Sequence, residues 1–208
     1  MSESYLEVEL RYKVQDVEKC LAHLEDLGIT VAHTKHLIDE WYLPNTITSI
    51  EEQRVWFDEE KGVAWRIRQI EHESKTELDV TSKQLTEDSN HNSFHETTAA
   101  FVSYDDAVRA MQEREYKNWL TIDKTRYFLS SSNPRIKDSE YELVIDHIAG
   151  LAEKIGVGAC LEIEHKGSFS RKEALERIEV IAASLGFTKE DQFEKSLTVV
   201  SMTELARF

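Results

Sequence analysis

The segment Glu7-Val8-Glu9-Leu10-Arg11-Tyr12-Lys13-Val14 decides how this chain folds, because charged and apolar residues alternate along it. Successive side chains of a β-strand point to opposite faces. A strand over residues 7–14 therefore carries two acids and then two bases on one face. The other face is apolar throughout.

The same alternation recurs along the chain and predicts eight strands. They are expected at residues 6–14, 28–43, 63–70, 77–85, 94–102, 119–129, 141–148 and 160–165. Helical spacing predicts helices at 17–27, 105–115 and 171–185. The expected N-caps are Asp16 for the first helix, the segment Tyr104-Asp105-Asp106 for the second, and Ser168 or Ser170 for the third. Gly28 and Gly186 are the stop signals that end the first and the third helix. Residues 50–58 allow a short helix or a hairpin loop. Many strands with few helices indicate an antiparallel sheet and an α+β fold.

Composition limits the classes of function. The 208 residues include 25 Lys and Arg against 40 Asp and Glu, a net charge of −15, and the length suits one domain over residues 1–208. This acidic excess argues against nucleic acid as the partner, because phosphate backbones are bound by basic residues. No apolar run is long enough to cross a bilayer and no signal peptide is recognised, so we expect a cytoplasmic protein without a membrane partner. Cys20 and Cys160 fit reduced core residues.

Charged residues also share one face on other predicted strands. They are Arg66 and Arg68; Asp79 with Lys83; Lys124 and Arg126; Glu142 and Asp146; and Glu162 and Glu164. Any single pair fits a solvated outer face best. The acids, however, gather in the first and last strands and the bases in the middle ones. This segregation predicts a site in which carboxylates hold divalent cations and basic groups hold phosphate.

If these faces turn inward, the strands enclose a charged channel and the helices cover the apolar outer faces.

Eight short motifs along the chain contain most of these charged residues. They are Glu7-x-Glu9-x-Arg11, Asp39-Glu40-Trp41-Tyr42, Trp65-Arg66-Ile67-Arg68, Lys83, Lys124-Thr125-Arg126, Asp146 with Gly150-Leu151, Glu162-Ile163-Glu164 and Lys195-Ser196-Leu197. In order and spacing they resemble the CYTH superfamily, the triphosphate tunnel metalloenzymes. That group includes class IV adenylate cyclases, thiamine triphosphatases and inorganic tripolyphosphatases.

The resemblance implies a closed eight-stranded antiparallel β-barrel with helices packed outside, whose lumen binds a triphosphate with Mg²⁺ or Mn²⁺. The implied metal ligands are Glu7, Glu9 and Glu164, with Asp146 and Glu162 as further ligands or support. The implied phosphate-binding residues are Arg11, Lys13, Arg66, Arg68, Lys83, Lys124, Arg126 and Lys195. Glu96, Lys83 and Arg126 are the implied catalytic residues, with Glu96 orienting water or a second metal ion.

Three functions remain open at this stage, all with a small-molecule triphosphate or phosphorylated ligand as partner. Metal-dependent hydrolysis of a triphosphate is favoured. A class IV adenylate cyclase would use the same metal ions and the same phosphate-binding basic residues, but it would also need an adenine pocket that the sequence does not locate. A non-catalytic binder is the third, because the family's middle Arg-x-Glu-x-Glu strand is reduced here to Phe94-His95-Glu96-Thr97-Thr98. The sequence also leaves the oligomeric state open, with a homodimer as one alternative.

Overall fold

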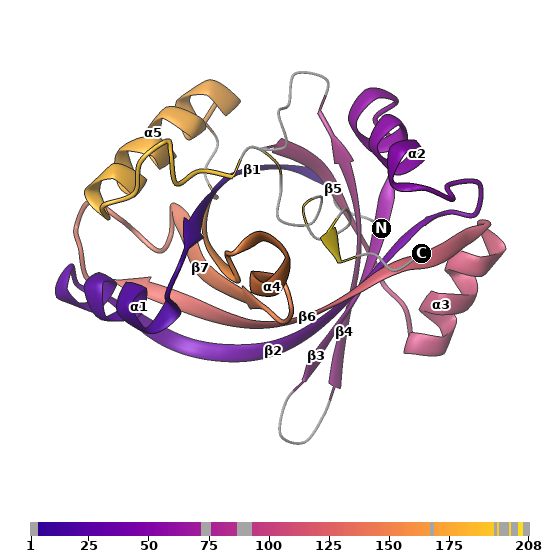
Figure 1. Ribbon diagram of the computed structural model, residues 1–208, viewed down its shortest axis with the longest axis horizontal. Helices are drawn as coiled ribbons and strands as arrows, with labels where there is room; N and C mark the ends of the chain where they lie inside the picture. The colour runs from indigo at the N-terminus through magenta and orange to yellow at the C-terminus, as the bar shows by residue number, and fades with distance from the viewer. Residues whose placement is uncertain are drawn as a thin grey trace.

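Antiparallel strands close into a barrel in the computed structural model, which describes residues 4–71, 76–86, 93–166, 169–193, 195, 200 and 204–205 (Figure 1). Around the barrel the order is β1-β5-β4-β3-β2-β6-β7-β8. The bounds are β1 Ser4–Val14, β2 Ile29–Pro44, β3 Ala64–Glu71, β4 Thr76–Leu85, β5 Ser93–Ala99, β6 Tyr116–Ser131, β7 Tyr141–Ile148 and β8 Ala159–His165. The predicted α+β fold with a closed eight-stranded barrel is confirmed.

Four of the helical segments lie on the two sides of the barrel (Figure 1). They are α1 Val17–Asp26 and α5 Arg171–Ser184 on one side, and α2 Ile50–Arg54 and α3 Tyr104–Glu113 on the other. A π-helical turn, η1 Val55–Glu59, continues α2, so the ambiguous segment is helical. A short helix that the sequence did not predict, α4 Ala152–Ile155, follows β7. No helix of the described residues is long and apolar enough to cross a membrane.

The predicted helix boundaries are mostly confirmed. Asp16 and Ser170 cap α1 and α5, whereas Ser168 lies outside the described residues. The predicted cap of α3 is wrong: Ser103 accepts the hydrogen bond from the backbone N–H of Asp106 and so starts the helix before Tyr104. β5 ends at Ala99 and not at residue 102 as predicted.

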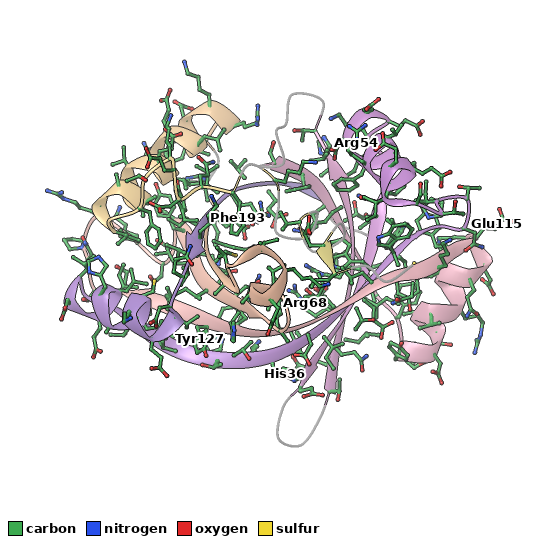
Figure 2. All side chains as sticks on the ribbon, in the orientation of Figure 1. His36, Arg54, Arg68, Glu115, Tyr127 and Phe193 are labelled. Carbon is green, nitrogen blue, oxygen red and sulfur yellow. The ribbon has the colours of Figure 1, made fainter. Side chains whose placement is uncertain are left out.

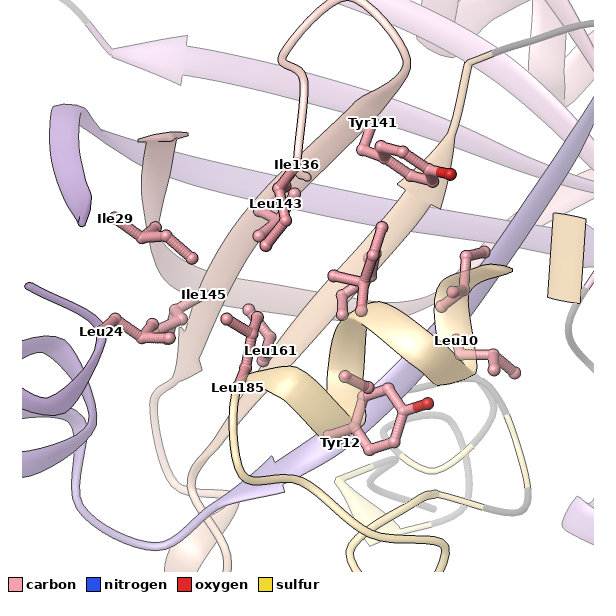
Figure 3. Packing of buried hydrophobic residues seen from close by; sticks show 14 of the residues in the cluster. Leu10, Tyr12, Leu24, Ile29, Ile136, Tyr141, Leu143, Ile145, Leu161 and Leu185 are labelled. Carbon is pink, nitrogen blue, oxygen red and sulfur yellow. The ribbon is translucent and has the colours of Figure 1, made fainter. Parts of the chain in front are cut away.

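An outer apolar layer joins the barrel to α1 and α5. Ile145 of β7 and Leu161 of β8 are completely buried there beside Leu24 of α1 and Ile178 of α5. Figure 3 shows Leu24, Ile145 and Leu161 close together. This layer uses the apolar faces of β1, β7 and β8, so the charged faces of these three strands point into the barrel.

An inner apolar cluster closes one end of the barrel. Trp41, Phe94 and Ile122 point inward like the charged residues of their strands, and pack with Leu151 and Ile155 at α4. The charged side chains begin directly above them: the Lys83 Nζ lies 5.3 Å from the centre of the Phe94 ring and the Arg66 Cζ lies 5.9 Å from the Trp41 ring. We call this cluster the floor of the barrel.

On the outside, His36 of β2 joins two neighbouring strands. Its ring nitrogens lie 2.5 Å from Glu71 of β3 and 2.7 Å from Asp123 of β6. Hydrogen bonds to both carboxylates raise the pKa of His36 above its usual value. Figure 2 shows Arg68 near the middle of the molecule and His36 close to its lower edge.

We expect Ile145→Ala to lower the free energy of unfolding by about 2–5 kcal/mol, because it leaves a cavity in the outer apolar layer. Urea unfolding measures the loss. Val180→Ala on α5 is the control, since Val180 is 71% exposed and its truncation should change stability by less than about 0.5 kcal/mol. Equal losses in the two variants would contradict the placement of this layer.

We expect the stability advantage of the native protein over His36→Gln to depend on pH. A histidine whose folded pKa is raised stabilises the fold below its unfolded pKa, about 6.5, and this contribution is lost as the pH rises through the folded pKa. The difference in melting temperature should therefore be larger at about pH 5.5 than at about pH 9. A difference independent of pH would show that the His36 contacts carry no charge.

Candidate functional site

The barrel encloses a cavity of about 210 Å³ whose lining is almost entirely charged. Of its fifteen lining residues, eight are acidic, six are basic and one, Val144, is apolar. They are Glu7, Glu9 and Arg11 of β1, Asp39 of β2, Arg66 and Arg68 of β3, Asp79 and Lys83 of β4, Glu96 of β5, Lys124 and Arg126 of β6, Glu142 and Val144 of β7, and Glu162 and Glu164 of β8. Every strand contributes to one enclosed site.

Two buried aspartates hold the basic side of the cavity. Asp39 accepts two hydrogen bonds from Arg68, at 2.5 and 2.7 Å, and lies 3.2 Å from the Lys124 ammonium. Asp146 accepts from Lys124 at 2.7 Å and twice from Arg126 at 2.6 Å. Bidentate contacts of this kind fix the plane of a guanidinium group. The basic groups therefore stand in set positions.

The charges of these bases decide the ionisation of both aspartates. Burial opposes the charged form of Asp39, but Arg68 and Lys124 outweigh it and hold the pKa of its carboxyl well below the usual value. Arg126 and Lys124 likewise lower the pKa of Asp146 against the effect of burial. Burial also lowers the pKa of Lys124, although both aspartates oppose this. Both aspartates are thus ionised at neutral pH.

The acidic side of the cavity lies where β1, β8 and β7 are neighbours. Glu164 stands opposite Glu9 on one strand and opposite Glu142 on the other. Burial, followed by the negative charges of Glu7 and Glu142, raises the pKa of Glu164 to about 8. Neighbouring like charges are destabilising unless something neutralises them. This side of the cavity thus attracts a cation.

Opposite charges meet between these two sides. The Lys83 ammonium lies 2.6 Å from Glu7 and 3.3 Å from Glu96. Arg11 pairs with Glu9 and donates to Glu162 at 3.0 Å. These contacts connect the acidic strands to the basic ones, so a ligand in the cavity would touch both kinds of charge.

Most of the residues selected from the sequence line the cavity, and their roles as ligands stay predictions. Lining it are Glu7, Glu9, Arg11, Arg66, Arg68, Lys83, Glu96, Lys124, Arg126, Glu162 and Glu164. Asp146 does not line it, because its carboxylate is completely buried behind Lys124 and Arg126.

Lys13 and Lys195 do not reach the cavity. Lys13 lies opposite Cys160 of the floor and donates to the Glu190 carbonyl at 3.3 Å, because it is one repeat further along β1 than Arg11. Lys195 follows the last helix and lies 3.4 Å from Asp58 of η1. The rest of its proposed motif, at residues 196 and 197, lies outside the described residues.

Three acidic residues of the lining were not selected from the sequence: Asp39, Asp79 and Glu142. Each stood in a quoted motif or charge pair. The signal that could have found them is the period of two, which places Asp79 on the face of Lys83 and Glu142 on the face of Asp146. Asp39 lies on the face of Trp41, whose burial in the floor marks that face as inward.

The donor set fits a hard divalent cation in chemistry but does not form a finished site. In the part of the chain that is described, no three His, Cys, Asp or Glu side chains already converge in an arrangement that could hold a metal ion. The groups on the acidic side are nevertheless all carboxylates, the oxygen ligands that Mg²⁺ and Mn²⁺ prefer. Burial, together with the negative charges of Glu7 and Glu142, raises the pKa of Glu164, and a nearby cation would favour its ionised form.

Comparison with known proteins supports the fold. No protein-family profile matches the chain, and no curated protein matches it by sequence. Among solved structures, a conserved hypothetical protein from Pyrococcus furiosus matches at 22% identity and a TM-score of 0.67, covering 92% of this chain and 97% of its own. A "putative adenylate cyclase" from Vibrio parahaemolyticus matches at 14% identity and a TM-score of 0.66, over 95% and 98% of the two chains.

A third structure joins two activities in its description. It is HpAC1 from Hippeastrum, described as a "putative adenylyl cyclase" with a dominant triphosphatase activity. It matches at 12% identity and a TM-score of 0.56, covering 100% of this chain and 98% of its own. At these identities the matches show the fold alone, which is that of the triphosphate tunnel enzymes.

We expect Asp39→Asn to lower the free energy of unfolding by about 3–5 kcal/mol, because it leaves Arg68 buried without its bidentate partner. Urea unfolding measures this loss. The control is Glu51→Gln on α2, which removes an exposed ion pair to Arg54 and should leave the unfolding midpoint unchanged. If Asp39→Asn behaved like the control, the pair would not hold the basic side together.

Proposed function

We propose that this chain, which has the fold of the triphosphate tunnel enzymes, is a divalent-metal-dependent triphosphatase. The observation that carries the proposal is the cavity itself, in which fourteen of fifteen lining residues are charged. Fixed bases on one side suit an extended polyanion, and carboxylates on the other suit the cations that accompany it.

The basic residues of the cavity would bind the phosphates. Arg66 and Arg68 of β3 and Lys124 and Arg126 of β6 lie on the two strands that flank β2, and β1 and β4 add Arg11 and Lys83. Ion pairs with Asp39 and Asp146 orient Arg68, Lys124 and Arg126 before the ligand arrives, so these three need little ordering on binding. In the partly enclosed cavity each contact to phosphate is stronger than in open water.

The residues on the acidic side would hold the metal. Glu7, Glu9 and Glu164 are the proposed ligands, with Glu162 beside them. Asp146 would support the site from behind Lys124 and Arg126. Bound Mg²⁺ or Mn²⁺ supplies charge neutralisation at phosphate oxygens and lowers the pKa of a bound water.

Hydrolysis then forms a bond between the water oxygen and the terminal phosphorus and breaks the bridging P–O bond. The diphosphate end leaves with the electron pair, and its charge is neutralised by the basic residues. Glu96, which lies 3.3 Å from the Lys83 ammonium, would accept a hydrogen bond from the attacking water and orient it.

One comparison favours hydrolysis over cyclisation of ATP. The Hippeastrum protein of the same fold is described as having a dominant triphosphatase activity. The basic residues and the carboxylates of the cavity would serve either reaction, so the reaction products must distinguish the hydrolase from the cyclase.

The direct test incubates the pure protein with tripolyphosphate, ATP or thiamine triphosphate, each with Mg²⁺ or Mn²⁺ and with a chelator. We expect metal-dependent release of phosphate. Cyclic AMP together with pyrophosphate would replace the hydrolase with the cyclase. Tight binding without any turnover would show that the protein is a phosphate-binding module.

We expect Glu9→Gln to lower kcat at saturating substrate by about 100-fold or more, the scale of losing one group that acts on the transition state. It should also weaken binding of Mn²⁺, measured by calorimetry on the substrate-free protein. Glu18→Gln on the exposed face of α1 is the matched control and should retain full activity. Unchanged turnover and Mn²⁺ affinity in Glu9→Gln would remove the metal assignment.

A further inference from the structure

The cavity is closed at one end and open at the other. Trp41 and Phe94 form part of the floor, with 1% and 2% of their surface exposed. The lining side chains farthest from the floor are far more accessible: Asp79 is 32% exposed and Glu142 is 30% exposed, against 3% for Asp39. An elongated ligand must therefore enter through this mouth, and whatever follows its phosphates stays there.

A pair of stacked rings stands at this mouth. Phe128 is the next inward-facing residue of β6 after Lys124 and Arg126, and it pairs in register with Val144 of the cavity lining. Its other register partner is His33 of β2. The two ring centres lie 4.3 Å apart with an angle of 12° between the planes. The rings thus continue the row of inward-facing side chains that contains Lys124 and Arg126, two of the proposed phosphate-binding residues.

The outer ring of this pair is accessible. Phe128 is partly buried and covers one face of the imidazole, whereas His33 is exposed. Part of the His33 side chain is therefore open to solvent. Lys35, whose ammonium lies 5.4 Å from the centre of the Phe128 ring, adds a positive charge beside the pair. We call His33, Lys35 and Phe128 the ring shelf.

The shelf offers what the cavity lacks. The lining gives phosphates every contact they need, but it would strip water from an organic ring without giving it an apolar surface. A planar ring is stabilised by stacking on an aromatic side chain. The shelf lies one side-chain repeat outward from Arg126, roughly 7 Å along the strand, so a group attached to the bound phosphates would reach it.

We propose that the ring shelf binds a planar aromatic group attached to the triphosphate, and that the substrate class is accordingly a nucleoside triphosphate and not inorganic tripolyphosphate. The inference rests on the proposed function for the position of the phosphates. His33 and Phe128 are then specificity residues: they hold the base, while the charged cavity binds the phosphates of any triphosphate alike.

The kinetic test compares ATP with tripolyphosphate in His33→Ala, Phe128→Leu and the control Thr34→Ala, whose side chain lies on the opposite face of β2. We expect both shelf variants to lower kcat/KM for ATP about 10-fold, mainly by raising KM, with tripolyphosphate kinetics and the control unchanged. Equal losses on both substrates, or no loss on ATP, would overturn the shelf.

A binding measurement separates this inference from the proposed function. The His33 ring resonances are assigned by their absence in His33→Ala and followed by NMR as ATP or tripolyphosphate is added with Ca²⁺. We expect ATP to shift them by ring stacking and tripolyphosphate to leave them in place. Such a shift without any turnover would support base binding by the ring shelf and contradict the proposed triphosphatase activity. Phosphate release from ATP without the shift would support the triphosphatase activity and contradict base binding by the shelf.

Discussion

Fourteen charged side chains can line one cavity only because opposite charges pair inside it. An isolated charge taken out of water is very costly, and removing one partner of a buried pair leaves that cost uncompensated. The Asp39–Arg68 pair and the contacts of Asp146 with Lys124 and Arg126 meet this requirement on the basic side. On the acidic side Glu164 stands opposite Glu9 and Glu142, which are acids themselves. The structure thus brings several carboxyl groups together where the proposed metal would bind.

The barrel makes this arrangement possible by using each strand face differently along its length. The outward faces pack on α1 and α5 at Leu24, Ile145 and Ile178. The inward faces are apolar at the floor, around Trp41 and Phe94, and charged above it. A closed barrel also leaves no sheet edge to protect. The site therefore rests on strands and not on loops.

The sequence located most of this site because a strand's side chains alternate with a fixed period of two. That period put Arg66 with Arg68, Lys124 with Arg126 and Glu162 with Glu164 on common faces, and the resemblance to the tunnel enzymes placed those faces inward. The same reasoning failed for Lys13, which shares the inward face of β1 but lies level with the floor. A period of two says which face a residue occupies and not how far along the barrel it sits. It also did not reveal that Asp39 holds the basic side together.

The strand pattern, the fold class and the charged faces of the strands follow from the sequence alone, because they depend on local periodicity and on the order of the motifs. The depth of each side chain within the barrel, the ion-pair partners and the contact of His33 with Phe128 at the mouth follow only from the folded barrel. Those properties depend on the register between strands that lie far apart in the chain. Register is set by barrel closure and packing of the whole molecule, which no single segment encodes.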